Sequence, residues 1–102
     1  MSLNINSLHV GLNSVLQDSV IKHQNLFNNY HEQLFKQEVK KDLMCYLDRW
    51  IYGKRNSFPN FDYNGAYFDI DIAIKDREVT YSLNTEVLLF LRYLLDHGAT
   101  NE

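Results

Sequence analysis

The 102-residue sequence has few residues that crosslink or bend a chain, with one Cys, one Pro and four Gly. Because Cys45 has no second cysteine to pair with, no intramolecular disulfide can form, and we expect a protein of a reducing compartment, the cytoplasm. No segment approaches the roughly 18 consecutive apolar residues of a membrane span, and the N-terminus lacks the regions of a secretory signal. We therefore expect neither membrane insertion nor export.

Motifs for catalysis and cofactor binding are also missing. The sequence contains no Gly-rich phosphate loop and no nucleophile elbow. Its four histidines lack the i, i+4 spacing of a helical zinc site, and Cys45 is expected to be a buried, inert thiol on a helix. His23 and His31 lie near apolar stripes, where we expect each to have one hydrogen-bonded ring nitrogen. The sequence thus predicts no catalytic residue, no cofactor and no metal ligand.

The composition predicts one globular domain over residues 1–102, with 45% hydrophobic and 23% charged residues. The net charge of −3 is unevenly distributed, since residues 1–56 carry seven Lys/Arg against five Asp/Glu and the remainder carries three against eight. This balance lacks the basic excess of nucleic-acid-binding proteins. The acidic second half instead favours a basic protein as partner.

The first half of the chain predicts long amphipathic helices. Between Leu12 and Tyr52 there is no Gly or Pro, and apolar residues recur every three or four positions. On a helical wheel, the apolar residues up to Phe27 and those that follow point in directions roughly half a turn apart. One straight helix therefore cannot bury both sets. We expect a break between Asn28 and Glu38, most favourably at Asn28-Asn29, which gives two or three N-terminal helices.

After the helices, the sequence predicts two reversals of the chain direction. Asn-Gly in Tyr63-Asn64-Gly65-Ala66 suits a type I′ hairpin turn, which needs positive φ at both central residues. A second two-residue turn is expected at Asp76-Arg77. Together they place the apolar residues of three strands on one face. These residues are Phe61, Tyr63, Phe68, Ile70, Ile72 and Ile74, with Val79, Tyr81 and Leu83 opposite the last three.

A C-terminal helix completes the pattern, with Asn84 as N-cap, Leu83 packed on Leu88, and a stop at His97-Gly98. Its core face is expected to hold Val87, Leu88, Phe90, Leu91, Leu94 and Leu95. The predicted fold is α+β in the order α-α-β-β-β-α, with the helices packed on a three-stranded antiparallel meander.

The candidate binding residues lie on the outer face of this meander and beside it. Acidic residues gather on that face together with an outward tyrosine, and exposed aromatics of the kind that anchor interfaces lie near its start. The predicted partner-binding residues are Asp62, Tyr67, Asp69, Asp71, Tyr52 and Phe58. They suggest a non-enzymatic interaction module that docks a basic protein, a profile shared by class analogy with the immunity proteins and antitoxins that neutralise toxic nucleases.

Two alternatives stay open. Leu89 and Tyr93 lie on the polar side of the C-terminal helix, where they would form the interface of a homodimeric scaffold or regulator. The three aspartates Asp62, Asp69 and Asp71 would alternatively hold a divalent cation in a small metal-dependent hydrolase.

Overall fold

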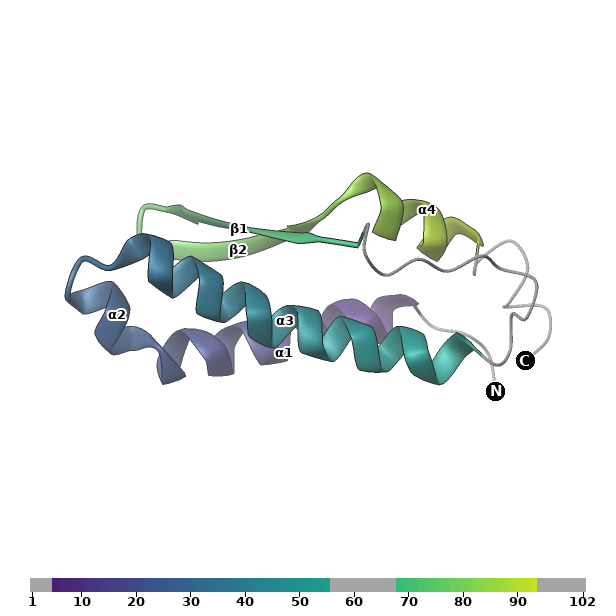
Figure 1. Cartoon of the computed structure of the whole chain (residues 1–102), viewed down its shortest axis with the longest axis horizontal. Helices are drawn as coiled ribbons and strands as arrows, with labels where there is room; N and C mark the ends of the chain where they lie inside the picture. Colours follow the sequence, from purple (N-terminus) through teal and green to yellow (C-terminus); the bar gives the residue numbers. More distant parts are fainter. Residues whose placement is uncertain (1–4, 56–67, 94–102) are drawn as a thin grey trace.

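The computed structural model describes residues 5–55 and 68–93 (Figure 1). The elements are α1 (Ile5–Lys22), α2 (Gln24–Asn28), α3 (Glu32–Arg55), β1 (Ile70–Lys75), β2 (Glu78–Leu83) and α4 (Thr85–Tyr93). The helices α1 and α3 lie side by side, and the two strands form a layer over them. This arrangement confirms the α+β class.

The predicted break between the long helices is confirmed. The short α2 ends at Asn28, Tyr30 has a positive φ of 64°, and α3 begins at Glu32. Asn29 supports the turn, because its side-chain Nδ2 donates to the carbonyl of Asn25 over 2.8 Å. A further interruption at His23 separates α1 from α2 and gives the third helix that the sequence left open.

The core is the seam between α1 and α3, covered by the inner face of the sheet. Residues spaced by four on α1 are buried against α3, as the apolar period requires. They are Leu8, Leu12 and Leu16, which meet Phe35, Val39, Leu43, Leu47 and Ile51 in one cluster with Phe68, Ile70 and the buried face of α4. Gly11 lets the helices approach closely, because a Cβ there would overlap the hydroxyl and ring of Tyr46.

The predicted pairing of the second hairpin is confirmed in full. Ile70 lies opposite Leu83, Ile72 opposite Tyr81 and Ile74 opposite Val79, and all six belong to the core cluster or pack against it. The turn residues Asp76 and Arg77 have positive φ angles of 52° and 67°. Both therefore adopt the type I′ conformation, although neither is the glycine that normally avoids the steric strain of a positive φ in such a turn.

The predicted three-stranded meander is wrong. The described sheet has two strands in the order β1-β2, and β1 begins only at Ile70. The turn at Tyr63–Ala66 lies outside the described residues, but Phe68 and Asp69, expected in the middle strand, are not in a strand. The Asp69 carboxylate accepts a hydrogen bond from the Ile70 N–H over 3.0 Å. It thereby occupies the donor that a further strand on this edge would use.

The C-terminal helix follows its expected N-terminus. The Asn84 side chain accepts a hydrogen bond from the Val87 N–H over 3.2 Å, which confirms the N-cap. Val87, Phe90 and Leu91 are buried as expected, whereas Leu88 is 53% exposed. The helix therefore uses a narrower apolar stripe than the sequence indicates. Leu94, Leu95 and His97-Gly98 lie outside the described residues.

Gly11→Ala tests the close approach of α1 to Tyr46. Alanine improves helix propensity by about 1 kcal/mol, but overpacking against the ring costs about 1–3 kcal/mol. We expect a lower free energy of unfolding in urea. In a Tyr46→Ala background the same substitution should be neutral or stabilising, and stabilisation in the natural background would contradict the packing.

Arg77→Gly tests the strained turn. A left-handed backbone costs a residue with a Cβ roughly 1–2 kcal/mol, and glycine is free of that cost. After the larger unfolded-state entropy of glycine is allowed for, we expect stabilisation by about 1 kcal/mol, read from the urea midpoint. Arg77→Ala is the matched control, since it removes the same side chain but keeps the strain. Equal effects of both changes would assign the difference to the guanidinium.

Candidate functional site

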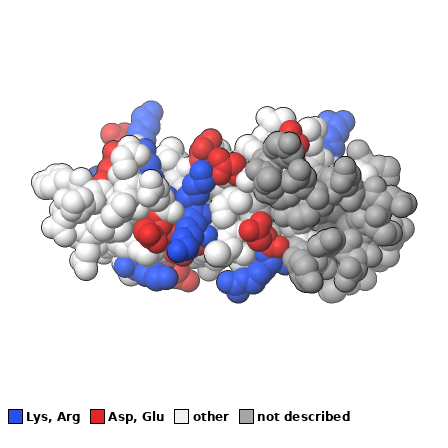
Figure 2. Space-filling view, in the orientation of Figure 1, with Lys and Arg blue, Asp and Glu red and all other residues white. Residues whose placement is uncertain are grey.

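The outer face of the sheet carries little net charge. Every side chain on it is exposed, namely Asp71, Ala73 and Lys75 of β1 and Glu78, Thr80 and Ser82 of β2. Lys75 lies directly opposite Glu78, and the Lys40 ammonium is 2.8 Å from the Asp69 carboxylate. In Figure 2, acidic and basic side chains of the described residues are interspersed rather than gathered by sign. Of the acidic residues predicted for this face, Asp71 is exposed on it, Asp69 pairs with Lys40, and Asp62 lies outside the described residues.

The described side chains are only weakly acidic in sum. They include ten Asp/Glu and eight Lys/Arg, because the side chains of Asp62, Asp96, Glu102, Lys54 and Arg55 lie outside the description. Charge complementarity to a basic protein thus has no strong support in the described part of the structure.

The other predicted binding and interface residues differ in whether the structure describes them and in how exposed they are. Asp62, Tyr67 and Phe58 lie outside the described residues, and Tyr52 belongs to α3 with its side chain outside that description. On α4, Leu89 is 57% exposed, whereas Tyr93 is half-buried against the core. The two predicted dimer residues thus differ in their exposure.

A serine, a histidine and an aspartate meet between α1 and α3. The Ser19 hydroxyl donates to the Asp42 carboxylate over 2.7 Å, and the His23 Nε2 lies 3.1 Å from the same oxygen. A nucleophilic triad would need the serine hydrogen-bonded to the histidine, but here both bond to the aspartate. Ser19 is also only 2% exposed. The cluster therefore joins the two helices and does not form a catalytic triad.

The cluster holds Asp42 in its charged form. Burial alone would raise the pKa of Asp42, but the hydrogen bonds from Ser19 and His23 and the positive charges of Lys22 and His23 together lower it below its ordinary value of 3.8. The prediction of a partnered nitrogen is thus confirmed for His23. It is wrong for His31, whose side chain is exposed at the start of α3, and Cys45 is also exposed rather than buried.

Residues 5–55 and 68–93 were compared with the patterns of metal ligands and of membrane-spanning helices. Within these ranges no three His, Cys, Asp or Glu side chains come together in a group able to hold a metal ion. No described helix combines the length and apolarity needed to cross a membrane. The hydrolase hypothesis keeps only Asp69 and Asp71 of its three aspartates in the described structure, and Asp69 already pairs with Lys40.

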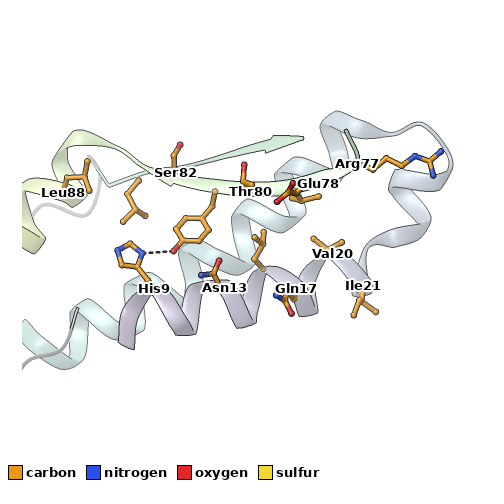
Figure 3. A pocket seen from close by; sticks show the side chains of 14 residues that line it. His9, Asn13, Gln17, Val20, Ile21, Arg77, Glu78, Thr80, Ser82 and Leu88 are labelled. Atoms are coloured by element: carbon orange, nitrogen blue, oxygen red, sulfur yellow. Dashed lines mark hydrogen bonds between the residues drawn. The ribbon is translucent and has the colours of Figure 1, made fainter. Parts of the chain in front are cut away.

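A groove of about 990 Å³ runs between α1 and β2 (Figure 3), at the upper end of the size of ligand pockets. From α1 it is lined by His9, Asn13, Leu16, Gln17, Val20 and Ile21, and opposite them lie residues 77–83 and Leu88. Two of these lining residues, Arg77 and Glu78 at the turn, are acidic or basic, and there are no others of the Lys, Arg, Asp or Glu type among them. The groove is therefore mainly apolar with neutral polar groups.

One hydrogen bond spans the groove near the N-terminal end of α1. The His9 Nδ1 and the Tyr81 hydroxyl are 2.8 Å apart, and the two rings stack with centroids 6.3 Å apart. Burial raises the pKa of Tyr81 above 10.0. The contact fixes the distance between β2 and α1 at this end, as Figure 3 shows.

The backbone of β2 faces the groove with its free edge. The Asn84 N–H donates to the Asp69 carbonyl over 3.1 Å, so these opposite residues form a hydrogen-bonded pair. Hydrogen-bonded and non-hydrogen-bonded pairs alternate along an antiparallel ladder. The backbone groups of Glu78, Thr80 and Ser82 are therefore the ones that bond to β1. The N–H and C=O groups of Val79, Tyr81 and Leu83 point away from β1.

Sequence reasoning missed this groove although part of the signal was present. The predicted meander already placed residues 78–83 at a sheet edge. Nothing in the apolar pattern, however, showed that α1 would lie beneath that edge. Leu16 and Val20 belong to the apolar arc of α1, and in the structure they also form the floor of an open surface.

Comparison of the chain with protein-family models, with curated proteins and with solved structures found no match.

Asp42→Asn tests the helix-joining cluster through its pH dependence. Because the folded pKa of Asp42 lies below the unfolded one, its charge stabilises the fold above about pH 3.9, and this contribution is lost as the pH falls through the folded pKa. Asparagine keeps an acceptor for Ser19 without the charge. We expect the variant to lose less stability than the natural protein between pH 5 and about pH 3.

Asp42→Ala provides the contrast at neutral pH. It leaves the buried Ser19 hydroxyl without its acceptor, which costs about 1–3 kcal/mol. Urea unfolding of both variants from pH 7 to pH 3 measures the two effects. Identical pH profiles for the natural protein and Asp42→Asn would contradict a lowered pKa.

Proposed function

We propose that this chain is a non-enzymatic protein-interaction module that binds a polypeptide partner in the groove between α1 and β2. The observation that carries the proposal is the size and character of that groove, about 990 Å³ beside an unpaired strand edge. Exposed apolar side chains lie along it, with Ile21 70% and Leu88 53% exposed. Apolar surface of this kind beside polar side chains is typical of interaction sites.

The chemistry of the described side chains favours binding over catalysis. The Ser19 hydroxyl of the cluster with His23 and Asp42 is only 2% exposed and bonds to the carboxylate, so it is not an accessible nucleophile. An inhibitor of the immunity-protein or antitoxin type is one role that such a module would serve, and it remains a proposal by class analogy. The single cysteine favours an encounter in the cytoplasm.

The binding surface in this proposal differs from the acidic face expected from the sequence. Asp69 is already paired with Lys40, and Asp71 lies on an exposed face with both signs of charge. The groove, by contrast, offers concave apolar area, which contributes more to affinity than isolated surface charges.

Two sets of substitutions distinguish the surfaces. Ile21→Glu with Leu88→Glu places charges in the groove at positions already exposed, so folding should be kept. Asp71→Lys reverses a charge on the sheet face and is the matched control. We expect a purified partner, first identified by crosslinking to the natural chain, to bind the groove variant at least tenfold more weakly and the face variant with unchanged Kd.

Calorimetric titration with the purified partner measures both constants, and thermal unfolding confirms that each variant is folded. Unchanged affinity of the groove variant together with lost affinity of Asp71→Lys would refute the groove and return the site to the acidic face.

A further inference from the structure

We infer that the groove takes an extended polypeptide segment, which pairs with β2 as a third strand of the sheet. This inference rests on the proposed function and names the chemistry of its partner.

The free edge offers hydrogen-bonding groups that have no described partner. Outside the ladder to β1, no hydrogen bond joins the backbone of Val79, Tyr81 or Leu83 to any residue that the structure describes. The opposite edge differs, because the Asp69 carboxylate accepts the Ile70 N–H and the polar side chains of Lys36 and Lys40 from α3 lie along it. Among the described residues, polar groups therefore lie at the Ile70 end of the β1 edge, whereas the β2 edge borders the groove.

The partial charges of that edge are complementary to another extended backbone. N–H donors and C=O acceptors recur at every second residue, about 6.8 Å apart at the rise of an antiparallel strand. A helix presents no free backbone groups at this spacing. The devices that usually prevent edge pairing, Pro, a bulge or an inward charge, are absent from β2. Strand addition is thus the binding mode that satisfies the edge.

The side chains under the edge determine which segment fits. A third strand would point alternate residues toward α1, where Leu16 and Val20 form the floor and Ile21 the outer wall. The other residues would face solvent, in line with Thr80 and Ser82. From His9 to Ile21, α1 extends about 18 Å at 1.5 Å per residue, which matches five or six extended residues. The expected ligand is therefore a short segment with apolar residues at alternate positions.

The layer widths explain why a single strand fits and a second copy does not. Packed helices lie about 8–10 Å apart, whereas strands lie about 4.8 Å apart. Two strands over α1 and α3 therefore leave part of α1 uncovered, and the exposed Asn13, Gln17 and Ile21 form that uncovered part. A second copy pairing through its own β2 would bring its α1 into the space that this α1 already occupies.

The test uses the full chain and a displayed library of random linear dodecapeptides, with the Ile21→Glu/Leu88→Glu variant used to remove unspecific binders. Peptides selected for the natural chain are then synthesised with one N-methyl group at each position in turn. Strand addition predicts at least a tenfold loss of affinity at every second residue over five or six residues and little change between them, because alternate N–H groups bond to the edge.

Hydrogen exchange gives a second readout that needs no variant. On peptide binding, the amides of Val79, Tyr81 and Leu83 should exchange at least tenfold more slowly. Those of Thr80 and Ser82 already bond to β1 and should change little. Val79→Pro removes one edge N–H without touching the ladder and should lower peptide affinity in a folded protein, whereas Thr80→Pro breaks the ladder and should unfold the hairpin.

The outcomes separate the inference from the proposed function. Peptides that bind in the groove without the alternating N-methyl pattern and without edge protection would overturn strand addition but leave a groove-binding module. Edge amides already protected in the free chain would mean that another segment of the chain or a second copy occupies the edge, and this too would overturn the inference. A selection that yields no peptide binding the natural chain more tightly than the groove variant would refute the proposed function itself.

Discussion

The helical layer of this protein is wider than the sheet that lies over it, and the exposed surfaces follow from that mismatch. Two packed helices need about twice the spacing of two paired strands. The sheet therefore covers the seam between α1 and α3, where the leucines of α1 are buried, but not the far side of α1. The groove is thus a consequence of the layer widths, and no missing side chain is needed to explain it.

The helices make different contacts with the two edges of the sheet. At β1, the side chains of α3 approach the edge, Lys40 pairs with Asp69, and the Asp69 carboxylate caps the first strand N–H. At β2, one hydrogen bond between described side chains, that of His9 with Tyr81, crosses the groove to α1. Polar groups thus lie at the Ile70 end of one edge, while the backbone groups of the other are directed to an apolar groove. The proposed binding surface follows from this asymmetry.

A hydrogen-bonded cluster and a close steric contact hold the helical layer in the geometry of the groove. The Ser19, His23 and Asp42 hydrogen bonds connect α1 to α3 near the turn, and Gly11 allows Tyr46 of α3 to pack closely farther along α1. Each replaces apolar contact with a specific geometry, which fixes the relative position of the helices. A chain with the same apolar seam but without these contacts would have a less defined distance between α1 and the sheet.

Local pattern in the sequence determined the helices, the break near Asn28, the β1-β2 register and the Asn84 cap, because each depends on neighbours within a few residues. The same reasoning failed for the third strand, since β1 begins only at Ile70, where the Asp69 carboxylate accepts the Ile70 N–H and pairs with Lys40 of α3, far away in the chain. It likewise assigned Asp69 to an open acidic face. Only the tertiary structure decided which edge is covered and where the groove lies, because both depend on how wide two helices are when they pack beneath two strands.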